Sequence, residues 1–176
     1  MTCILACLPA TAGAATASDG GASPDDARYA PAANAKIVNG YAIPPRSAPR
    51  RVKQAIEAAN EIVDKPYRYG GGHASVKDSG YDCSGTISYA LIGGGLLKSP
   101  LDSGSFMSWG QRGKGKWISV YAHGGHAYAV IAGLRLDTGM RDPNGARYGQ
   151  KPGSGPRWNK TMRDPSGYRV RHPANF

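Results

Sequence analysis

The spacing of apolar side chains predicts an amphipathic helix at the start of the folded region. From residue 47 onward, apolar residues recur at helical spacing along one face, and charged or amide side chains occupy the rest of the helical wheel. Ser47 is a favoured N-cap residue, and Pro66 predicts that the helix ends at about Asp64. The apolar positions are Val52, Ala55, Ile56, Ala59, Ile62 and Val63. We expect this face to pack on a core.

A shorter helix is predicted directly after Asp82. Asp is a favoured N-cap residue, and the run that follows it ends in three glycines, 93–95, which stop helices. This prediction places Cys83 in the first turn of the helix.

Strand patterns dominate the later part of the chain. Residues 117–122, 125–132 and 134–138 read as consecutive strands separated by glycines, and 168–171 is a weaker fourth strand. The 125–132 strand is apolar on both faces apart from His126, so we expect it to be central in a sheet. Residues 139–165, rich in Gly, Pro, Asp, Arg and Lys, predict an extended basic loop.

Composition divides the chain of 176 residues into three parts. Residues 1–17 carry no charge and end in Ala-Thr-Ala, which is typical of a secretory signal peptide, although a basic n-region is missing. A flexible Ala-rich tail is the alternative, and Cys7 loosely matches a lipoprotein lipidation site. Residues 18–46 have the composition of a flexible linker. Residues 47–176 then form one domain of ordinary size.

The charge of the chain favours anionic partners. The formal net charge is +10, and none of it comes from residues 1–17. A basic surface fits wall polymers, anionic lipid or nucleic acid, and charge alone does not choose among them. No later stretch approaches the roughly 20 consecutive apolar residues that a membrane span requires. We expect a soluble monomer that is secreted or held in the cell wall or periplasm.

Cysteine usage singles out Cys83. The other two cysteines, Cys3 and Cys7, lie in the predicted signal peptide, so Cys83 has no partner for an internal disulfide. It is therefore either an inert buried thiol or a thiol kept for chemistry. In the first turn of a helix, backbone N–H groups and the positive end of the helix dipole would stabilise a thiolate.

A catalytic thiol needs a base, for which the chain offers four histidines. His126 is the preferred candidate, because packing on both sides of a central strand would fix its position. The alternative is a core histidine that has only a structural role. His73 and His123 lie among glycines in predicted loops, and His172 lies near the end of the sequence.

Other kinds of site are not supported by the sequence. The glycine runs do not match a phosphate-binding loop, and the cysteines and histidines lack zinc-ligand spacing, so we expect no cofactor and no metal. Basic residues of 139–171, with Tyr148 and Trp158, have features of a nucleic-acid surface. A wall polymer or plain solvation explains them equally well, and we expect no nucleic-acid partner.

Three motifs occur in a characteristic order. They are Pro-Tyr-Arg-Tyr-Gly-Gly at 66–71, Tyr-Asp-Cys-Ser-Gly at 81–85, and Gly-His-Ala-Tyr-Ala-Val-Ile-Ala-Gly at 125–133. From about residue 47 to residue 138, the chain resembles the NlpC-type family of papain-like cell-wall cysteine peptidases. The resemblance implies an α+β fold, with helices packed on a small antiparallel sheet and the nucleophile at a helix N-terminus facing a histidine on the sheet.

The resemblance also implies an activity and a set of site residues. Members of the family cleave amide bonds of peptidoglycan stem peptides, commonly between D-glutamate and a diamino acid. Cys83 would be the nucleophile, His126 the base, and Tyr67 the aromatic residue whose hydroxyl lies near the thiol. The backbone N–H of Cys83 would contribute to an oxyanion hole. The third catalytic residue would be Asp137 on the strand after the histidine, with His172 as the competing candidate and a solvated strand-end carboxylate as the alternative for Asp137.

The sequence departs from the family pattern at two places. The usual Pro-Gly-Asp-Leu before the histidine strand is replaced by residues 116–121, and Gly-Ser-Gly-Pro-Arg-Trp at 153–158 has no counterpart. These departures leave the scissile bond open. The same fold could also serve an amidase, an acyltransferase, or a catalytically silent basic module that binds the wall.

Overall fold

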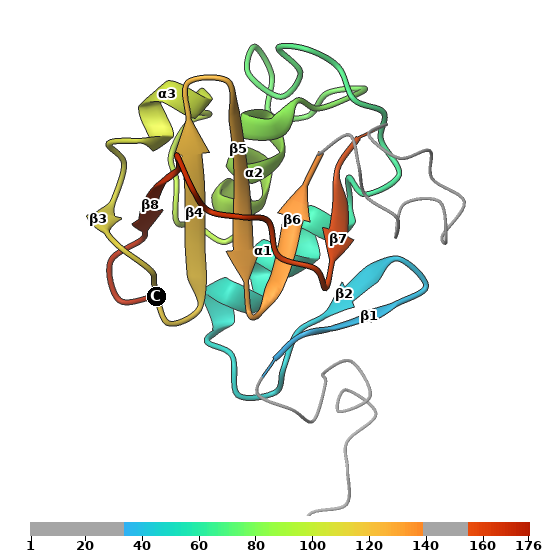
Figure 1. Ribbon diagram of the computed structural model, residues 1–176. Helices are drawn as coiled ribbons and strands as arrows, with labels where there is room; N and C mark the ends of the chain where they lie inside the picture. The colour runs from blue at the N-terminus through green and yellow to red at the C-terminus, as the bar shows by residue number, and fades with distance from the viewer. Residues whose placement is uncertain (1–33, 139–154) are drawn as a thin grey trace, which may run out of the picture.

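The computed structural model describes residues 34–138 and 155–176, and this part of the chain has an α+β architecture (Figure 1). The helices are α1 (Arg50–Asn60), α2 (Cys83–Gly93) and the short α3 (Ser103–Phe106). The strands are β1 (Lys36–Val38), β2 (Tyr41–Ile43), β3 (Gln111–Arg112), β4 (Ile118–His123), β5 (His126–Ile131), β6 (Leu134–Asp137), β7 (Arg157–Asn159) and β8 (Arg169–His172). No helix in these residues is both long enough and apolar enough to span a bilayer.

A six-stranded antiparallel sheet forms the centre of the molecule. Its strand order is β3-β8-β4-β5-β6-β7, so β5 lies between β4 and β6. The predicted strands at 117–122, 125–132, 134–138 and 168–171 correspond to β4, β5, β6 and β8, each within one residue at either end. The central place expected for the strand that begins with His126 is therefore confirmed.

Alternating side chains give the sheet one apolar face. Ala127, Ala129 and Ile131 of β5 are buried in the main core, together with alternate residues of β4 and β6. Helices α1 and α2 pack against each other, α2 packs on β5 and β6, and both helices lie behind the sheet in Figure 1. The helices thus cover the apolar face, as expected for an amphipathic α1.

Helix α1 is shorter than the apolar pattern predicts. We expected an N-cap at Ser47, but the helix begins at Arg50, and the Pro49 carbonyl accepts hydrogen bonds from Val52 and Lys53 at 3.0 and 3.1 Å. The reason is that a residue before proline is disfavoured in helical conformation, so the helix cannot extend back through Ala48. At the other end the chain leaves the helix after Asn60 and continues in turns to residue 64.

Part of the predicted linker is structured. Within 18–46, residues 36–43 form the β1–β2 hairpin, and Ala42 is fully buried in the core. The turn is Asn39-Gly40, with φ of 50° and 87°, and two consecutive positive φ angles at Asn-Gly are typical of a tight hairpin turn. The linker prediction rested on composition and gave no weight to this dipeptide.

Asn60 at the end of α1 joins the hairpin to the sheet. Its side chain accepts from the Ala42 backbone N–H at 2.9 Å and donates to the Ala42 carbonyl at 2.8 Å. The indole N–H of Trp158 in β7 donates to the same Asn60 oxygen at 2.8 Å. One amide therefore connects three segments that are distant in the sequence.

Strand β7 corrects the prediction of an extended loop over 139–165. Residues 157–159 pair with β6, and Arg157, Trp158 and Asn159 are all buried. Residues 139–154 of the predicted loop lie outside the described part of the chain. The strand is short and contains two polar side chains, so it lacks the alternating pattern that identified the other strands.

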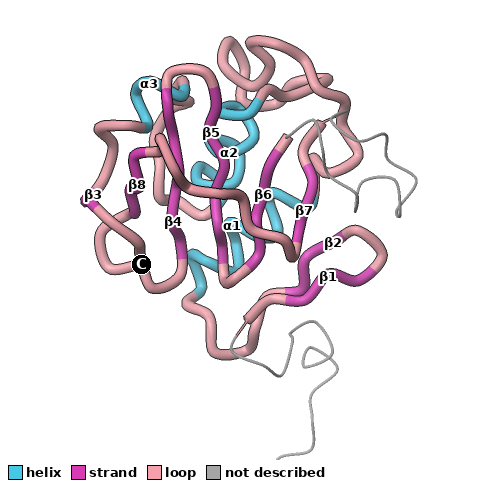
Figure 2. Tube along the Cα trace, viewed as in Figure 1, coloured by secondary structure: helices cyan, strands magenta, loops and turns pink. Residues whose placement is uncertain are grey.

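The connection from β7 to β8 passes over the front of the sheet. In Figures 1 and 2 this segment, residues 160–168, runs from β7 across β6, β5 and β4 to β8 on the side away from α1 and α2. We call it the crossing segment. The Tyr168 ring lies 5.1 Å from that of Tyr128 on β5 and 4.5 Å from that of His123 on β4, measured between centroids. These contacts fix the end of the crossing segment on the sheet.

We predict that Asn60→Ala destabilises the fold by about 2–3 kcal/mol, because it removes three hydrogen bonds and leaves the Ala42 backbone without this partner. Denaturant unfolding measures the change. Glu57→Ala, at an exposed position of the same helix, is the control and should stay within about 0.5 kcal/mol of the parent protein. Equal stability of the two variants would contradict the role given to Asn60.

Candidate active site

Cys83 is the first residue of α2, and Asp82 caps the helix. Oδ1 of Asp82 accepts a hydrogen bond from the Gly85 backbone N–H at 2.7 Å, which confirms the predicted N-cap. The Cys83 thiol is free and only partly buried, so it does not fit the description of a fully buried, inert thiol. The N-terminal end of α2 favours negative charge at this position.

The Asp82 carboxylate also holds the glycine-rich loop before it. Its Oδ2 accepts from the Gly70 backbone N–H at 3.1 Å, and its Oδ1 lies 3.0 Å from Nε2 of His73. A Cβ on Gly85 would collide with the Gly71 carbonyl oxygen, so this loop and the first turn of α2 touch through their backbones. The glycines thus permit the close approach that fixes the position of Cys83.

Tyr67 is brought toward Cys83 by a backbone bridge to Tyr81. The Tyr81 N–H donates to the Pro66 carbonyl at 3.0 Å, and the Arg68 N–H donates to the Tyr81 carbonyl at 3.2 Å. Partial burial raises the pKa of Tyr67, and negative charge at Cys83 and Asp82 adds to the rise. The phenol therefore remains a neutral hydrogen-bond donor near the thiol.

His126 opens β5 and contacts Asp137 at the end of β6. The distance between Nε2 of His126 and Oδ1 of Asp137 is 2.9 Å, and the exposed fractions of the two side chains are 18% and 1%. Burial lowers the pKa of His126, but hydrogen bonds to Asp137 and to Cys83 outweigh it and raise the pKa to about 9. Since Nε2 faces Asp137, Nδ1 is the nitrogen left for Cys83.

Asp137 is an ionised carboxylate in a buried position. Burial raises its pKa, but the hydrogen bond with His126 and the charges of His126, Arg163 and Arg135 outweigh burial, so the net direction is downward. An ionised Asp137 stabilises the imidazolium form of His126 and fixes the orientation of its ring. The two side chains can therefore act as a base and its orienting group.

Arg163 is the site residue that sequence reasoning missed. It lies on the crossing segment, with Nη1 2.8 Å from Nε2 of His126 and 3.0 Å from Oδ2 of Asp137. It belongs to no motif, and it comes 26 residues after Asp137 in a stretch that was predicted as loop. No local pattern in the sequence pointed to it.

The remaining histidines lie in different places. His172 is on β8, where Arg171 pairs with Val120, so it lies toward the start of β4, whereas His126 pairs with His123 at the end of β4. His172 Nδ1 is 3.1 Å from the Gly113 carbonyl oxygen. His123, which we expected in a loop, ends β4, and its ring centroid is 6.4 Å from that of His126. Asp137, and not His172, is thus the residue that contacts His126.

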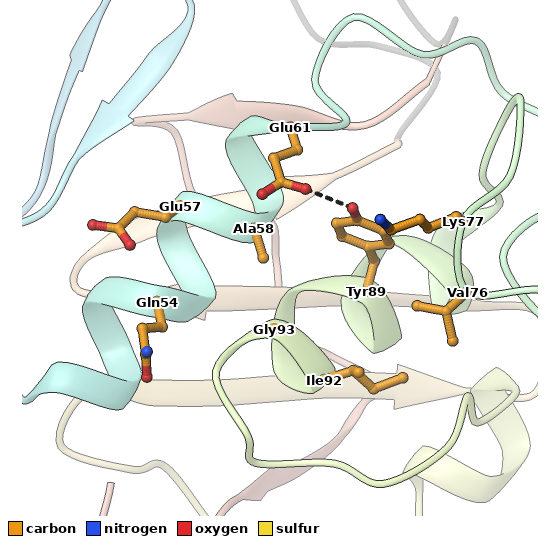
Figure 3. A pocket seen from close by; sticks show the side chains of 9 residues that line it. All are labelled: Gln54, Glu57, Ala58, Glu61, Val76, Lys77, Tyr89, Ile92 and Gly93. Carbon is orange, nitrogen blue, oxygen red and sulfur yellow. Dashed lines mark hydrogen bonds between the residues drawn. The ribbon is translucent and has the colours of Figure 1, made fainter.

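A pocket of about 370 Å³ lies elsewhere, between α1, α2 and the loop at 76–77 (Figure 3). Figure 3 shows the Tyr89 hydroxyl directed at Glu61, to which it donates at 2.6 Å. The lining residues are Gln54, Glu57, Ala58, Glu61, Val76, Lys77, Tyr89, Ile92 and Gly93. None of them belongs to the predicted catalytic set. In residues 34–138 and 155–176 no three His, Cys, Asp or Glu side chains are grouped as ligands for one metal ion.

Comparison with known proteins gives a likeness to solved structures. The peptidoglycan hydrolase RipB from Mycobacterium tuberculosis is 20% identical, with a TM-score of 0.49 over 71% of this chain and 68% of that one. A hypothetical invasion protein of the same organism is 21% identical, with a TM-score of 0.49 over 72% of this chain and 66% of that one. The resuscitation promoting factor interacting protein RipA, mutated at a cysteine, is 21% identical, with a TM-score of 0.48 over the same shares.

This chain thus spans about two thirds of the length of each of these structures. The likeness is one of fold. No protein-family model matches the sequence. No curated protein matches it either.

We predict that Asp137→Asn lowers the pH at which His126 loses its proton. The imidazolium persists up to about pH 9 in the parent protein, because its pKa is raised to about 9. Without the carboxylate, burial and the nearby arginines lower that pKa, so the proton is lost nearer neutral pH. The rate of Cys83 alkylation by iodoacetamide, followed against pH, reports this titration.

Asp164→Asn, which removes an exposed carboxylate from the crossing segment, is the control and should leave the profile unchanged. Asp137→Asn also leaves the nearly buried Arg135 without its carboxylate, at a cost of about 3 kcal/mol, so circular dichroism must verify that the variant is folded. A folded Asp137→Asn protein with an unshifted profile would contradict the assignment.

Proposed function

We propose that this protein is an NlpC-type cysteine peptidase that hydrolyses amide bonds of peptidoglycan stem peptides, of the D-glutamyl–diamino acid endopeptidase type. The observation that carries the proposal is the contact between His126 and Asp137 beside a cysteine that opens a capped helix. Cys83 and His126 lie in the motifs that resemble the family, and Asp137 lies at the position that the resemblance implies for the third residue. The roles that follow are those of Cys83 as nucleophile, His126 as base, Asp137 as orienting residue and Tyr67 as a neighbouring donor.

In the acylation step, the Cys83 thiolate attacks the carbonyl carbon of the scissile amide and forms a C–S bond. The carbonyl oxygen becomes an oxyanion, for which the backbone N–H of Cys83 and the Tyr67 hydroxyl are the proposed donors. When the intermediate collapses, the C–N bond breaks, and the Nδ1 proton of His126 passes to the leaving amine. The products of this step are a free amine and a thioester on Cys83.

In the second step, neutral His126 accepts a proton from water through Nδ1, and the resulting hydroxide attacks the thioester carbon. The C–S bond breaks, the carboxylic acid product leaves, and the thiolate–imidazolium pair is restored. Asp137 holds the other nitrogen, Nε2, in its protonated form throughout, which keeps the lone pair of Nδ1 directed at the reacting atoms. The chemistry needs no metal and no cofactor.

The charge of the chain fits an acidic polymer as substrate. Its formal net charge is +10, and peptidoglycan stems and wall polymers carry carboxylates or phosphates. We propose that residues 1–17 direct export and that the protein acts as a monomer in the cell wall, the periplasm or the medium. We propose residues 47–176 as the catalytic domain, and the hairpin at 36–43 packs on the same core.

We predict that digestion of purified peptidoglycan releases soluble peptides with the parent protein and not with Cys83→Ala. Loss of the nucleophile should lower the rate by roughly a thousandfold or more. Mass spectrometry of the fragments identifies the bond, and cleavage between D-glutamate and the diamino acid is the expected result. Cys83→Ala should unfold at nearly the same denaturant concentration as the parent protein, so a loss of activity reports on chemistry.

Other outcomes would change the assignment in defined ways. Fragments cut between the glycan and the peptide would indicate an amidase, and transfer to an added amine in place of water would indicate an acyltransferase. Release that is equal in the parent and in Cys83→Ala would contradict thiol catalysis. A folded protein that binds peptidoglycan but releases nothing would be the silent wall-binding module.

A further inference from the structure

The crossing segment places a guanidinium against the base of the proposed site. Nη1 of Arg163 lies 2.8 Å from Nε2 of His126 and 3.0 Å from Oδ2 of Asp137. Oδ1 of the same carboxylate lies 2.9 Å from Nε2. The three groups therefore form a closed triangle in which Asp137 uses one oxygen for each partner.

The proton on Nε2 decides which of these contacts is a hydrogen bond. A protonated Nε2 donates to Asp137, whereas an unprotonated Nε2 would accept from Arg163, and one nitrogen cannot do both. Base catalysis through Nδ1 needs the proton on Nε2. Arg163 is thus compatible with catalysis when it donates to Asp137, and Oδ2 at 3.0 Å is available for that bond.

The other cation near Oδ2 does not replace Arg163. Nε of Arg135 is 3.2 Å from Oδ2 of Asp137, within ion-pair distance, but its N–H is not aligned for a hydrogen bond to that oxygen. Arg135 therefore contributes charge, and Arg163 contributes a directed bond. Only the directed bond restricts rotation of the carboxylate about its own axis.

Resting on the proposed function, we propose that Arg163 is a positioning residue: it donates to Oδ2 of Asp137 and so holds Oδ1 against Nε2 of His126. It touches Asp137 and the far nitrogen of the imidazole, and it acts on the reaction through these two residues. The crossing segment is accordingly a part of the catalytic apparatus that the motifs do not contain.

The crossing segment is held firmly enough to serve this purpose. Tyr168 packs against Tyr128 and His123 at its end. Within it, the Asp164 carboxylate accepts from the Ser166 backbone N–H at 3.0 Å, and the Tyr168 N–H donates to the Pro165 carbonyl at 3.0 Å. Arg163 directly precedes this turn, so its backbone is fixed on the C-terminal side.

Several charged or titratable groups of the described residues lie around His126 and its partners Asp137 and Cys83. They are His123 from β4, Tyr128 from β5, Arg135 from β6, and Arg163 and Tyr168 from the crossing segment, with Tyr67 beside Cys83. Among the cations of residues 34–138 and 155–176, Arg163 is the one in direct contact with the ring. Its removal should therefore change the titration of His126 more than removal of a distant charge.

The test compares Arg163→Met and Arg163→Lys in the full chain, with Arg169→Met as the control. Arg169 is an exposed cation one residue beyond the crossing segment. Hydrolysis of peptidoglycan peptides gives kcat and KM, and Cys83 alkylation by iodoacetamide gives the pH profile independently of hydrolysis. Thermal unfolding verifies that each variant is folded.

We predict that Arg163→Met lowers kcat by about 10- to 100-fold, because the carboxylate is no longer aligned, while KM changes less than about twofold. The pH at which His126 loses its proton should rise by about one unit, because a cation in contact with the imidazolium has been removed. This shift is opposite in sign to that of Asp137→Asn. Arg163→Lys should keep the pH profile and recover part of kcat, and Arg169→Met should change neither.

Each contrary outcome has a separate meaning. A rise in KM with kcat unchanged would show that Arg163 contacts the substrate, and unchanged kcat and pH profile would show that it has no role. Either result would overturn the proposal. If the parent protein shows no thiol-dependent hydrolysis, the proposed function fails, and the alkylation profile of Arg163→Met then still decides whether Arg163 sets the state of His126.

Discussion

The buried carboxylate of Asp137 is the constraint around which the site is arranged. Its side chain is 1% exposed, and a carboxylate in such a position is stable only if hydrogen-bond donors and positive charge converge on it. The donors come from the first residue of β5 and from the crossing segment. Burying this one group thus requires the start of β5, the end of β6 and the chain after β7 to meet at the same end of these strands.

Asp82 has the corresponding task on the other side of the site. It caps α2, accepts from the backbone of the glycine-rich loop, and lies against His73. Asp82 thereby fixes the backbone that carries the thiol, and Asp137 fixes the ring that exchanges the proton. The nucleophile and the base are held by separate carboxylates on separate elements, so each can be disturbed without directly displacing the other.

The parts of this structure that could be predicted are those with a local signal. The alternation and glycine punctuation of 117–138 identify β4, β5 and β6, and Asp82 followed by Cys83 identifies the start of α2. The family resemblance implied a polar residue on the strand after His126 and left Asp137 and His172 as candidates, and the structure places Asp137 2.9 Å from the imidazole.

The parts that could not be predicted depend on long-range contacts. Strand β7 is defined by pairing with β6, and Arg163 reaches His126 only because the crossing segment turns back over the sheet. The hairpin at 36–43 is an intermediate case, since its Asn-Gly turn was visible in the sequence but its burial depends on Asn60.

Strand β8 inserts between β3 and β4, although both precede it by more than forty residues, so during synthesis the hairpins of β4, β5 and β6 can form while the neighbouring place in the sheet is still empty. A nascent chain that already contains Cys83, His126 and Asp137 therefore still lacks Arg163 and strand β8. The site is complete only after β8 has joined the sheet.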